Sequence, residues 1–113
     1  QSAAIDGETS ISGVVQIGEK SVISNSIIEG PVAIGNGVTI SDSHIRPFTS
    51  IGDGVRVSDS TLEDSVLLEG CVIDRAGLIT ASLVGSNSKV SGSTVSTDSN
   101  TLLLGDNSII DLS

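Results

Sequence analysis

The chain has 113 residues, enough for one domain, and it contains one Phe and no Trp, Tyr or Met. Aliphatic side chains must therefore supply nearly all of the buried apolar area, which excludes a core built on large aromatic residues. The formal net charge of −9 argues against nucleic acids and anionic membranes as partners, because both require patches of Lys and Arg.

Cysteine content and hydropathy restrict the class further. Cys71 is the only cysteine, so the chain cannot form an intramolecular disulfide. No apolar run approaches the length of a membrane span, and the first residues lack the basic and apolar regions of a signal peptide. We therefore expect a soluble cytoplasmic protein. Because the chain begins with Gln1 rather than Met, we expect a processed product or an excised domain.

In chain order, residues 1–10 are weakly patterned, with only Ile5 in phase with the later repeat, and we expect them to cap the N-terminal end. From Ile11 onward an aliphatic residue recurs in repeated steps of six, six and five. These residues stand at positions 11, 17, 23, 28, 34, 40, 45, 51, 57, 62 and 68. A helix would show steps of three and four. The pattern instead predicts an all-β solenoid with three short strands and 17 residues per coil, each strand stacked about 4.8 Å from its equivalent.

One phrase marks the same corner of successive coils. It reads IGEKSVI from Ile17, IGNGVTI from Ile34, IGDGVRV from Ile51, LEGCVI from Leu68, VGSNSKV from Val84 and LGDNSII from Leu104. The glycine after the inward aliphatic residue is expected to turn the chain with a positive φ. At another corner Asn25, Asp42 and Asp59 recur, residue types that tolerate the same conformation.

Alternation along each strand assigns the two sides. The repeat aliphatic residue and the residue two before it are expected to point inward, and the residue between them outward. The second inward set is Ser26, Val32, Val38, Ser43, Thr49, Val55, Ser60 and Val66, and the outward set is Ile27, Ala33, Thr39, His44, Ser50, Arg56, Thr61 and Leu67.

The later part of the chain is less regular. Residues 73–79 break the phase and are expected to bulge, and residues 96–101 are expected to form a loop before the last coil, LLLGDNSIIDL. We expect about six coils in a single domain, residues 1–113.

The order of these phrases resembles the carboxy-terminal domain of long-form glucose-1-phosphate thymidylyltransferases, a family of sugar nucleotidyltransferases. PFTSIGD, from Pro47 to Asp53, is similar to that family's GPYTSIGD, and the closing LGDNS is similar to its terminal phrase. One departure is Arg46, where the family usually has Gly. The resemblance implies a left-handed parallel β-helix, whereas the residue pattern alone does not set the handedness.

The same resemblance places nucleotidyl transfer in an amino-terminal α/β domain that holds the triphosphate with a Gly-rich basic loop. No segment of this chain resembles such a loop. The resemblance therefore implies a non-catalytic oligomerisation or scaffold domain, with no cofactor, in an enzyme of dTDP-sugar biosynthesis.

His44 supports an alternative, because hexapeptide acyltransferases that resemble this repeat use a histidine on the coil surface as general base. With His44 as base, the chain would be an acyl- or acetyltransferase acting on a sugar or sugar nucleotide. Against this, coenzyme A needs basic groups for its phosphates, and the chain has only five Lys and Arg residues. The other interpretation of His44 is a surface or interface residue.

No metal site is expected. The zinc site of γ-type carbonic anhydrases, which share this coil, needs three imidazoles, and one is available per chain. Asn25, Asp42 and Asp59 could hold a hard cation, but carboxylates at one corner more often only bind water. An ice-binding face would need a regular outward array of Thr, and one face instead presents Ile27, His44, Thr61 and Leu78.

Association is the function that the outward residues favour. A strip of six outward positions is unusually apolar, and such a strip usually marks a protein–protein contact. It consists of Pro31, Ala33, Phe48, Ser50, Leu67 and Leu83. We expect a homo-oligomer, preferably a trimer of prisms packed side by side. The strip could alternatively pack against an amino-terminal nucleotidyltransferase domain.

Overall fold

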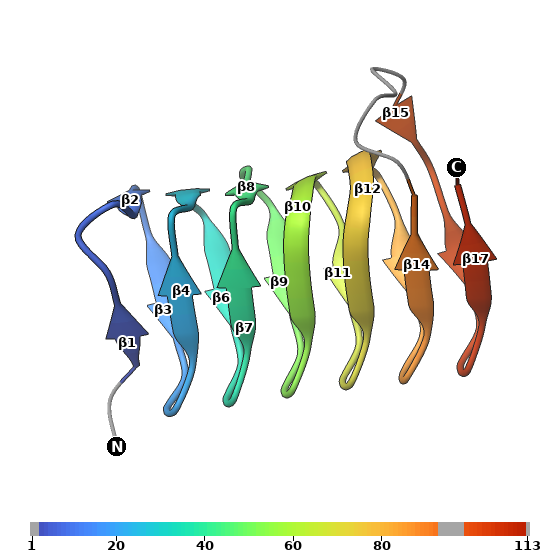
Figure 1. Ribbon diagram of the computed structural model, residues 1–113, viewed down its shortest axis with the longest axis horizontal. Coiled ribbons are helices and arrows are strands. Elements are labelled where there is room, and N and C mark those ends of the chain that lie inside the picture. Colours follow the sequence, from blue (N-terminus) through green and yellow to red (C-terminus); the bar gives the residue numbers. More distant parts are fainter. Residues whose placement is uncertain (1–2, 93–98, 113) are drawn as a thin grey trace.

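The computed structural model describes residues 3–92 and 99–112 and shows a three-sided coil. Figure 1 views the coil with its axis horizontal, the N-terminus at the left and the C-terminus at the right. Every described element is a β-strand, and every strand pair is parallel. The all-β solenoid expected from the repeat is confirmed.

The strands form three faces, each with one strand segment per coil. Face 1 consists of β1 (Ala4–Ile5), β4 (Val22–Ser24), β7 (Thr39–Ser41), the first half of β10 (Arg56–Glu63), the first half of β12 (Val72–Thr80), β14 (Lys89–Ser91) and β17 (Ile109–Asp111). Face 2 consists of β2 (Ser10–Ser12), β5 (Ile27–Glu29), β8 (His44–Ile45), the second halves of β10 and β12, and β15 (Ser99–Asn100). Face 3 is a six-stranded sheet of β3 (Val15–Ile17), β6 (Val32–Ile34), β9 (Thr49–Ile51), β11 (Val66–Leu67), β13 (Leu83–Val84) and β16 (Leu103–Leu104).

The coil is left-handed. In Figure 1 the chain rises along the near strands of face 1 and descends along the far strands of face 3 while it advances toward the C-terminus. The six strands of face 3 correspond to six coils. Pairs such as Val15 with Val32 and Val32 with Thr49 show the 17-residue repeat directly.

The inward and outward assignments expected from the sequence are confirmed from Ser26 to Leu62, where the residues expected to point inward are buried. The prediction for positions 66–68 is wrong by one residue. Leu67 is 1% exposed and lies in the core, whereas Val66 is 40% and Leu68 38% exposed. The chain reaches β11 one residue sooner than it reaches β9, because only Glu63 and Asp64 follow Leu62 at this corner, whereas Arg46, Pro47 and Phe48 follow Ile45. Ser50 accordingly pairs with Val66, 16 residues later.

The core is a stack of aliphatic layers, one per coil. Its fully buried side chains include Ile23, Ile28, Ile40, Ile45, Leu62, Leu67, Ile73 and Ile79. Only at the two ends are the core residues half-buried, because no further coil covers them; examples are Ile17 and Leu104. Burial of apolar area in regular layers thus replaces the aromatic core that the composition excludes.

The positive φ expected at the glycines that follow the inward aliphatic residues is wrong. The positive φ lies two residues later, for example at Gly37 and Gly54, and not at Gly35. Gly35 is required for a different reason: a Cβ there would stand 2.3 Å from the Asp53 Oδ1 atom and 2.9 Å from the Asp53 nitrogen in the next coil. Close approach between coils therefore selects glycine at this position.

The stacked corner of Asn25, Asp42 and Asp59 behaves as expected. All three have φ close to +49°, the left-handed region that Asn and Asp tolerate best after Gly.

Buried hydroxyl groups join successive coils from the inside. Ser43 Oγ donates to the carbonyl oxygen of Ser41 (2.7 Å), and the backbone N–H of Ser60 donates to Ser43 Oγ (3.3 Å). The same arrangement links Ser26 to Ser43, where the Ser43 N–H donates to Ser26 Oγ (3.2 Å). These bonds explain why small hydroxyl residues occupy an inward position.

Of the segments expected to depart from the repeat, the bulge at 73–79 is confirmed, whereas parts of the other two form paired strands. The pairing of β10 with β12 shifts register between Ser58 and Ser60, and Arg75 and Gly77 have positive φ, which confirms the bulge at 73–79. Of the loop expected at 96–101, residues 96–98 lie outside the described residues. Ser99–Asn100 already forms β15 and pairs with Leu78 and Ile79 of β12. In the expected N-terminal capping region, residues 1–2 lie outside the described residues and Ala4–Ile5 already pairs with Val22–Ile23 of β4.

Candidate functional site

A shallow, open groove of about 470 Å³ follows the edge between faces 1 and 2. One wall is the corner stack of Asn25, Asp42 and Asp59, and the other is the outward side of face 2. The groove is lined by Asn25, Ile27, Asp42, Ser43, His44, Asp59, Ser60, Thr61 and Gly77. It is the place where the predicted candidate His44 meets other polar groups.

His44 lies on β8, between Ile27 of β5 and Thr61 of β10. Its Nε2 is 2.6 Å from Oε1 of Glu29, and the side chains of His44 and Glu29 are 30% and 44% exposed. A carboxylate accepts hydrogen bonds, so Nε2 of His44 carries a hydrogen in this contact, and in the neutral imidazole Nδ1 is then the acceptor. The strand thus holds one imidazole in a defined tautomer at the edge of the groove.

Arg46, two residues after His44, takes part in an ion pair. Arg46 NH1 is 3.1 Å from Oε1 of Glu63, one coil further along. Because both side chains are well exposed, this pair contributes little to stability. The ion pair does, however, compensate the charge of Arg46, the arginine nearest in sequence to His44.

The acidic wall is connected by hydrogen bonds. Asn25 Nδ2 donates to Asp42 Oδ1, and the Asn25 N–H donates to Asp6 Oδ1 (3.2 Å). The hydrogen bond from Asn25, aided by those from Thr9 and Glu8, holds the pKa of the Asp6 carboxyl below its usual value. In the part of the chain that the structure describes, no three His, Cys, Asp or Glu side chains are grouped so as to hold a metal ion.

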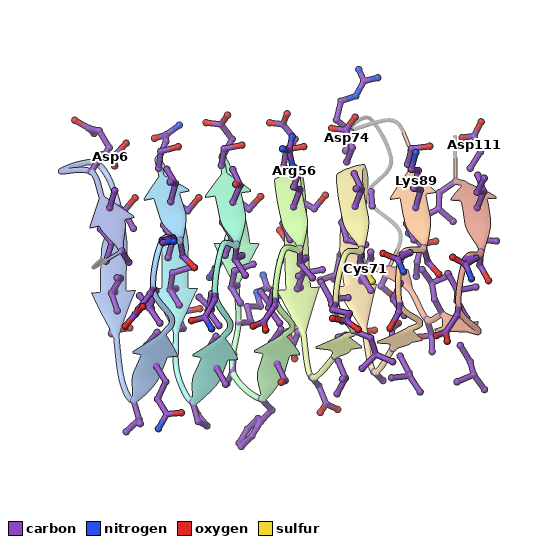
Figure 2. The ribbon with its side chains drawn as sticks, turned by 90° about the horizontal axis from the view of Figure 1, so that it is seen from below. Asp6, Arg56, Cys71, Asp74, Lys89 and Asp111 are labelled. Atoms are coloured by element: carbon purple, nitrogen blue, oxygen red, sulfur yellow. The ribbon has the colours of Figure 1, made fainter. Side chains whose placement is uncertain are left out.

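Cys71 lies inside the coil and not on a surface (Figure 2). Its thiol donates to the Gly85 carbonyl oxygen (2.9 Å), as Ser21 Oγ does to that of Gly35 (2.8 Å). Burial raises the pKa of the Cys71 thiol. A buried thiol with a raised pKa is a packing residue and not a nucleophile.

Face 3 is the second candidate surface. Its outward residues in coil order are Gln16, Ala33, Ser50, Val66, Leu83 and Leu103, none of them charged. Face 1, in contrast, carries Arg56 and Lys89, which project from the coil in Figure 2. Val66, Leu83 and Leu103 are 40%, 39% and 81% exposed. Large apolar side chains are therefore open to solvent along half of this face.

The predicted strip requires one correction and gains residues. Leu67 is buried and cannot contribute to a surface; Val66 takes the outward position because the corner before β11 is one residue shorter. Pro31, Ala33, Phe48, Ser50 and Leu83 are exposed as expected, with Phe48 at 69%. The sequence analysis missed Val14 and Leu103. The 17-residue spacing of Val14, Pro31 and Phe48 was a signal that could have identified Val14. A small hollow of about 260 Å³ beside these residues is lined by Val14, Gln16, Pro31, Val32, Ala33 and Thr49.

Comparison with known proteins supports the fold. No protein-family model and no curated protein matches the sequence. Among solved structures, the acetyltransferase domain of PglB from Neisseria gonorrhoeae is 17% identical, with a TM-score of 0.53 over 97% of this chain and 54% of that one. A hexapeptide transferase family protein from Anaplasma phagocytophilum is 20% identical (TM-score 0.49, 97% and 70% of the two chains). UDP-N-acetylglucosamine O-acyltransferase from Moraxella catarrhalis is 16% identical (TM-score 0.47, 96% and 65%). At 17% identity, the likeness to the PglB domain supports the β-solenoid fold and not an activity.

Among the described residues, no helix is long and apolar enough to cross a bilayer.

Proposed function

We propose that this chain is an assembly domain that binds further copies of itself through face 3, within a larger protein of the sugar-1-phosphate nucleotidyltransferase type. The observation that carries the proposal is the uncharged, apolar outward ladder of face 3 on a chain with a net charge of −9. Two such chains repel each other at every acidic surface. Only a face without charges lets them approach while burying apolar area.

The three-sided shape favours a closed ring of three copies around an axis parallel to the coil. A flat sheet on each copy can then contact its neighbours along the whole length of the prism. The parent activity is inferred from the PFTSIGD phrase, whose Phe48 stands at the edge of face 3 beside β9. Nucleotidyl transfer would take place in another domain of the parent chain, and we place the protein in the cytoplasm, where sugar nucleotides are made.

A charge placed on face 3 is expected to disrupt the assembly. Val66→Asp puts a carboxylate among Ser50, Leu83 and the same residues of a neighbouring copy, and burying an unpaired charge is unfavourable. We expect association to weaken about 100-fold or more, measured by sedimentation equilibrium. Val22→Asp is the matched control, because Val22 is 46% exposed on face 1 and should tolerate the change without loss of association. Equal masses for the two variants at all concentrations would contradict the assignment of face 3.

A second candidate function is acyl transfer to a sugar hydroxyl or amine, with His44 as general base. The specific observation is the 2.6 Å contact of His44 with Glu29 in the groove, which leaves Nδ1 free to take a proton from the attacking group. The likeness to the acetyltransferase domain of PglB also favours it. Within one chain, however, the groove does not fit the phosphates of coenzyme A: Asp42 and Asp59 line it, and Arg46 is bound to Glu63.

The two candidates are separated by an activity measurement. If His44 is the base, purified chain turns over acetyl-CoA in the presence of an aminosugar or sugar nucleotide. His44→Ala then lowers kcat/KM about 100-fold or more, and Glu29→Gln about tenfold through loss of the fixed tautomer. Thr39→Ala, on face 1 away from the groove, is the control and should be fully active. Turnover no faster than without protein rejects acyl transfer for these acceptors and leaves the assembly proposal in place.

A further inference from the structure

The chain has a single Phe, Trp or Tyr residue, Phe48, and its side chain is 69% exposed. Phe48 stands immediately before β9, at the corner between faces 2 and 3. An aromatic side chain buries about 150–250 Å² when it is enclosed, which is the main reason that such a residue stabilises a protein. At this exposed corner, most of that stabilisation is not used by the coil itself.

The backbone of Phe48 has a conformation that suits other residues better. Its φ is +66°, in the left-handed region, where a bulky side chain is unfavourable. The next two coils make the same corner with Asp64 and Ala81, at φ of +51° and +48°, and both of these residues are small. The corner therefore requires a left-handed turn but not an aromatic residue. Backbone strain of this kind is concentrated at functional positions.

The hollow of about 260 Å³ on face 3 lies beside this corner. It extends over the first three coils and has no charged residue in its lining, which consists of Val14, Gln16, Pro31, Val32, Ala33 and Thr49. Small-molecule sites are larger, roughly 300–1,000 Å³, so the hollow is better suited to one large side chain. Phe48 does not line the hollow of its own chain. The chain thus presents an exposed aromatic side chain and an uncharged hollow next to each other.

The position of Phe48 along the coil favours a second copy as the occupant of the hollow. In a ring of three copies around an axis parallel to the coil, equivalent coils of neighbouring copies stand at the same height. Phe48 precedes β9 in the third coil, and the hollow reaches Thr49 of the same strand. A corner residue of one copy then meets the hollow on the face of the next copy. Such a head-to-tail contact is the type that closes a ring.

We propose that Phe48 of one copy is seated in the hollow of the next copy and is the anchor of the contact. The inference rests on the proposed self-association through face 3, and it adds the two features that fix how neighbouring copies meet. Aromatic side chains enclosed in central pockets contribute much of the binding free energy of protein interfaces. The burial of Phe48 in the assembly offsets the strain of its left-handed backbone in the single chain.

Phe48→Asn tests the anchor in two measurements on the whole chain, because Asn tolerates the left-handed turn and lacks the ring. At a concentration at which wild type is monomeric, we expect this variant to raise the thermal midpoint by about 3 °C or more, since the strain is relieved. In sedimentation equilibrium the same variant should weaken self-association about 30-fold or more. Phe48→Tyr keeps the ring and should associate like wild type.

Ala33→Leu tests the hollow from the other side of the contact. Ala33 is exposed on face 3, so a larger side chain occupies the hollow without entering the core. We expect Ala33→Leu to weaken association about tenfold. The double variant with Phe48→Asn should be no weaker than Phe48→Asn alone, because both changes remove the same contact. Thr39→Leu, an enlargement at an exposed position of face 1, is the control and should associate like wild type.

The outcomes separate this inference from the proposed function. If Phe48→Asn associates as tightly as wild type while Val66→Asp dissociates, face 3 is the interface and the inference about Phe48 is overturned. Additive effects of Ala33→Leu and Phe48→Asn would also overturn it, since Phe48 would then be seated elsewhere. A lower thermal midpoint for monomeric Phe48→Asn would show that the ring serves the coil itself and would contradict the inference. If wild type is a monomer at every concentration, the proposed self-association fails, and the inference fails with it.

Discussion

Gly85→Ala is expected to destabilise the coil by about 3 kcal/mol and to lower its thermal midpoint by about 10 °C or more. A Cβ at this position would stand 2.4 Å from the Gly105 carbonyl carbon, 2.5 Å from the Gly105 oxygen and 2.6 Å from the Asp106 nitrogen. All three atoms belong to the backbone of the next coil, so no side-chain rotation can make room. Gly85 also donates its N–H to the Leu104 carbonyl oxygen (2.9 Å), and this bond would be stretched as the coils separate.

Gly105→Ala is the matched control, because Gly105 stands at the same corner one coil later and has nothing within 4 Å of its Cβ position. We expect a change within about 0.5 kcal/mol. Thermal unfolding followed by circular dichroism measures both variants. Since each coil contacts only its neighbours, amide hydrogen exchange should also show that Gly85→Ala loosens residues 99–112 first. Equal stability of the two variants would contradict the close approach of the coils at Gly85.

Leu67→Ala is expected to cost about 3 kcal/mol, whereas Leu68→Ala should cost less than about 1 kcal/mol. Leu67 is 1% exposed and fills a layer of the core, so its truncation leaves a cavity that a rigid stack of coils cannot close. Leu68 is 38% exposed at the corner and leaves no cavity. Chemical denaturation with a common slope for both variants gives the two values.

This pair of variants tests the change of register directly, because the uninterrupted six, six, five pattern predicts the opposite order. A larger loss for Leu68→Ala than for Leu67→Ala would restore that pattern and would return Leu67 to the surface strip.

Much of the fold was predictable because a stacked coil repeats its environment every 17 residues. Each buried layer then selects an aliphatic residue at the same place, and Ile23, Ile40 and Val57 show this selection. The slip at residues 63–67 was harder to predict, since Val66, Leu67 and Leu68 are all apolar and hydropathy cannot rank them. The glycine in LEGC was the available signal: Gly70 has the positive φ of Gly37 and Gly54, which fixes Leu68 at the corner.

The candidate site was predictable only as single residues. Spacing placed His44 outward on face 2, but its contact with Glu29 is a diagonal one between the adjacent strands β5 and β8, and the 17-residue spacing does not single out this pair. The hydroxyl of Thr49, which is buried and has no hydrogen-bond partner among the described residues, was likewise not predictable from the repeat. Periodicity determines which residues face inward, but it does not determine which of their polar atoms find partners.

Because the core is fully packed, the function depends on what the outer faces contact. The lack of charge and the exposed apolar side chains of face 3 favour contact with another copy of the chain. The most direct test of this claim is sedimentation equilibrium of the unmodified chain from low to high micromolar concentration. We predict a mass that rises with concentration to about three times the 11.4 kDa of one chain. A mass that stays at 11.4 kDa throughout this range would contradict the proposal.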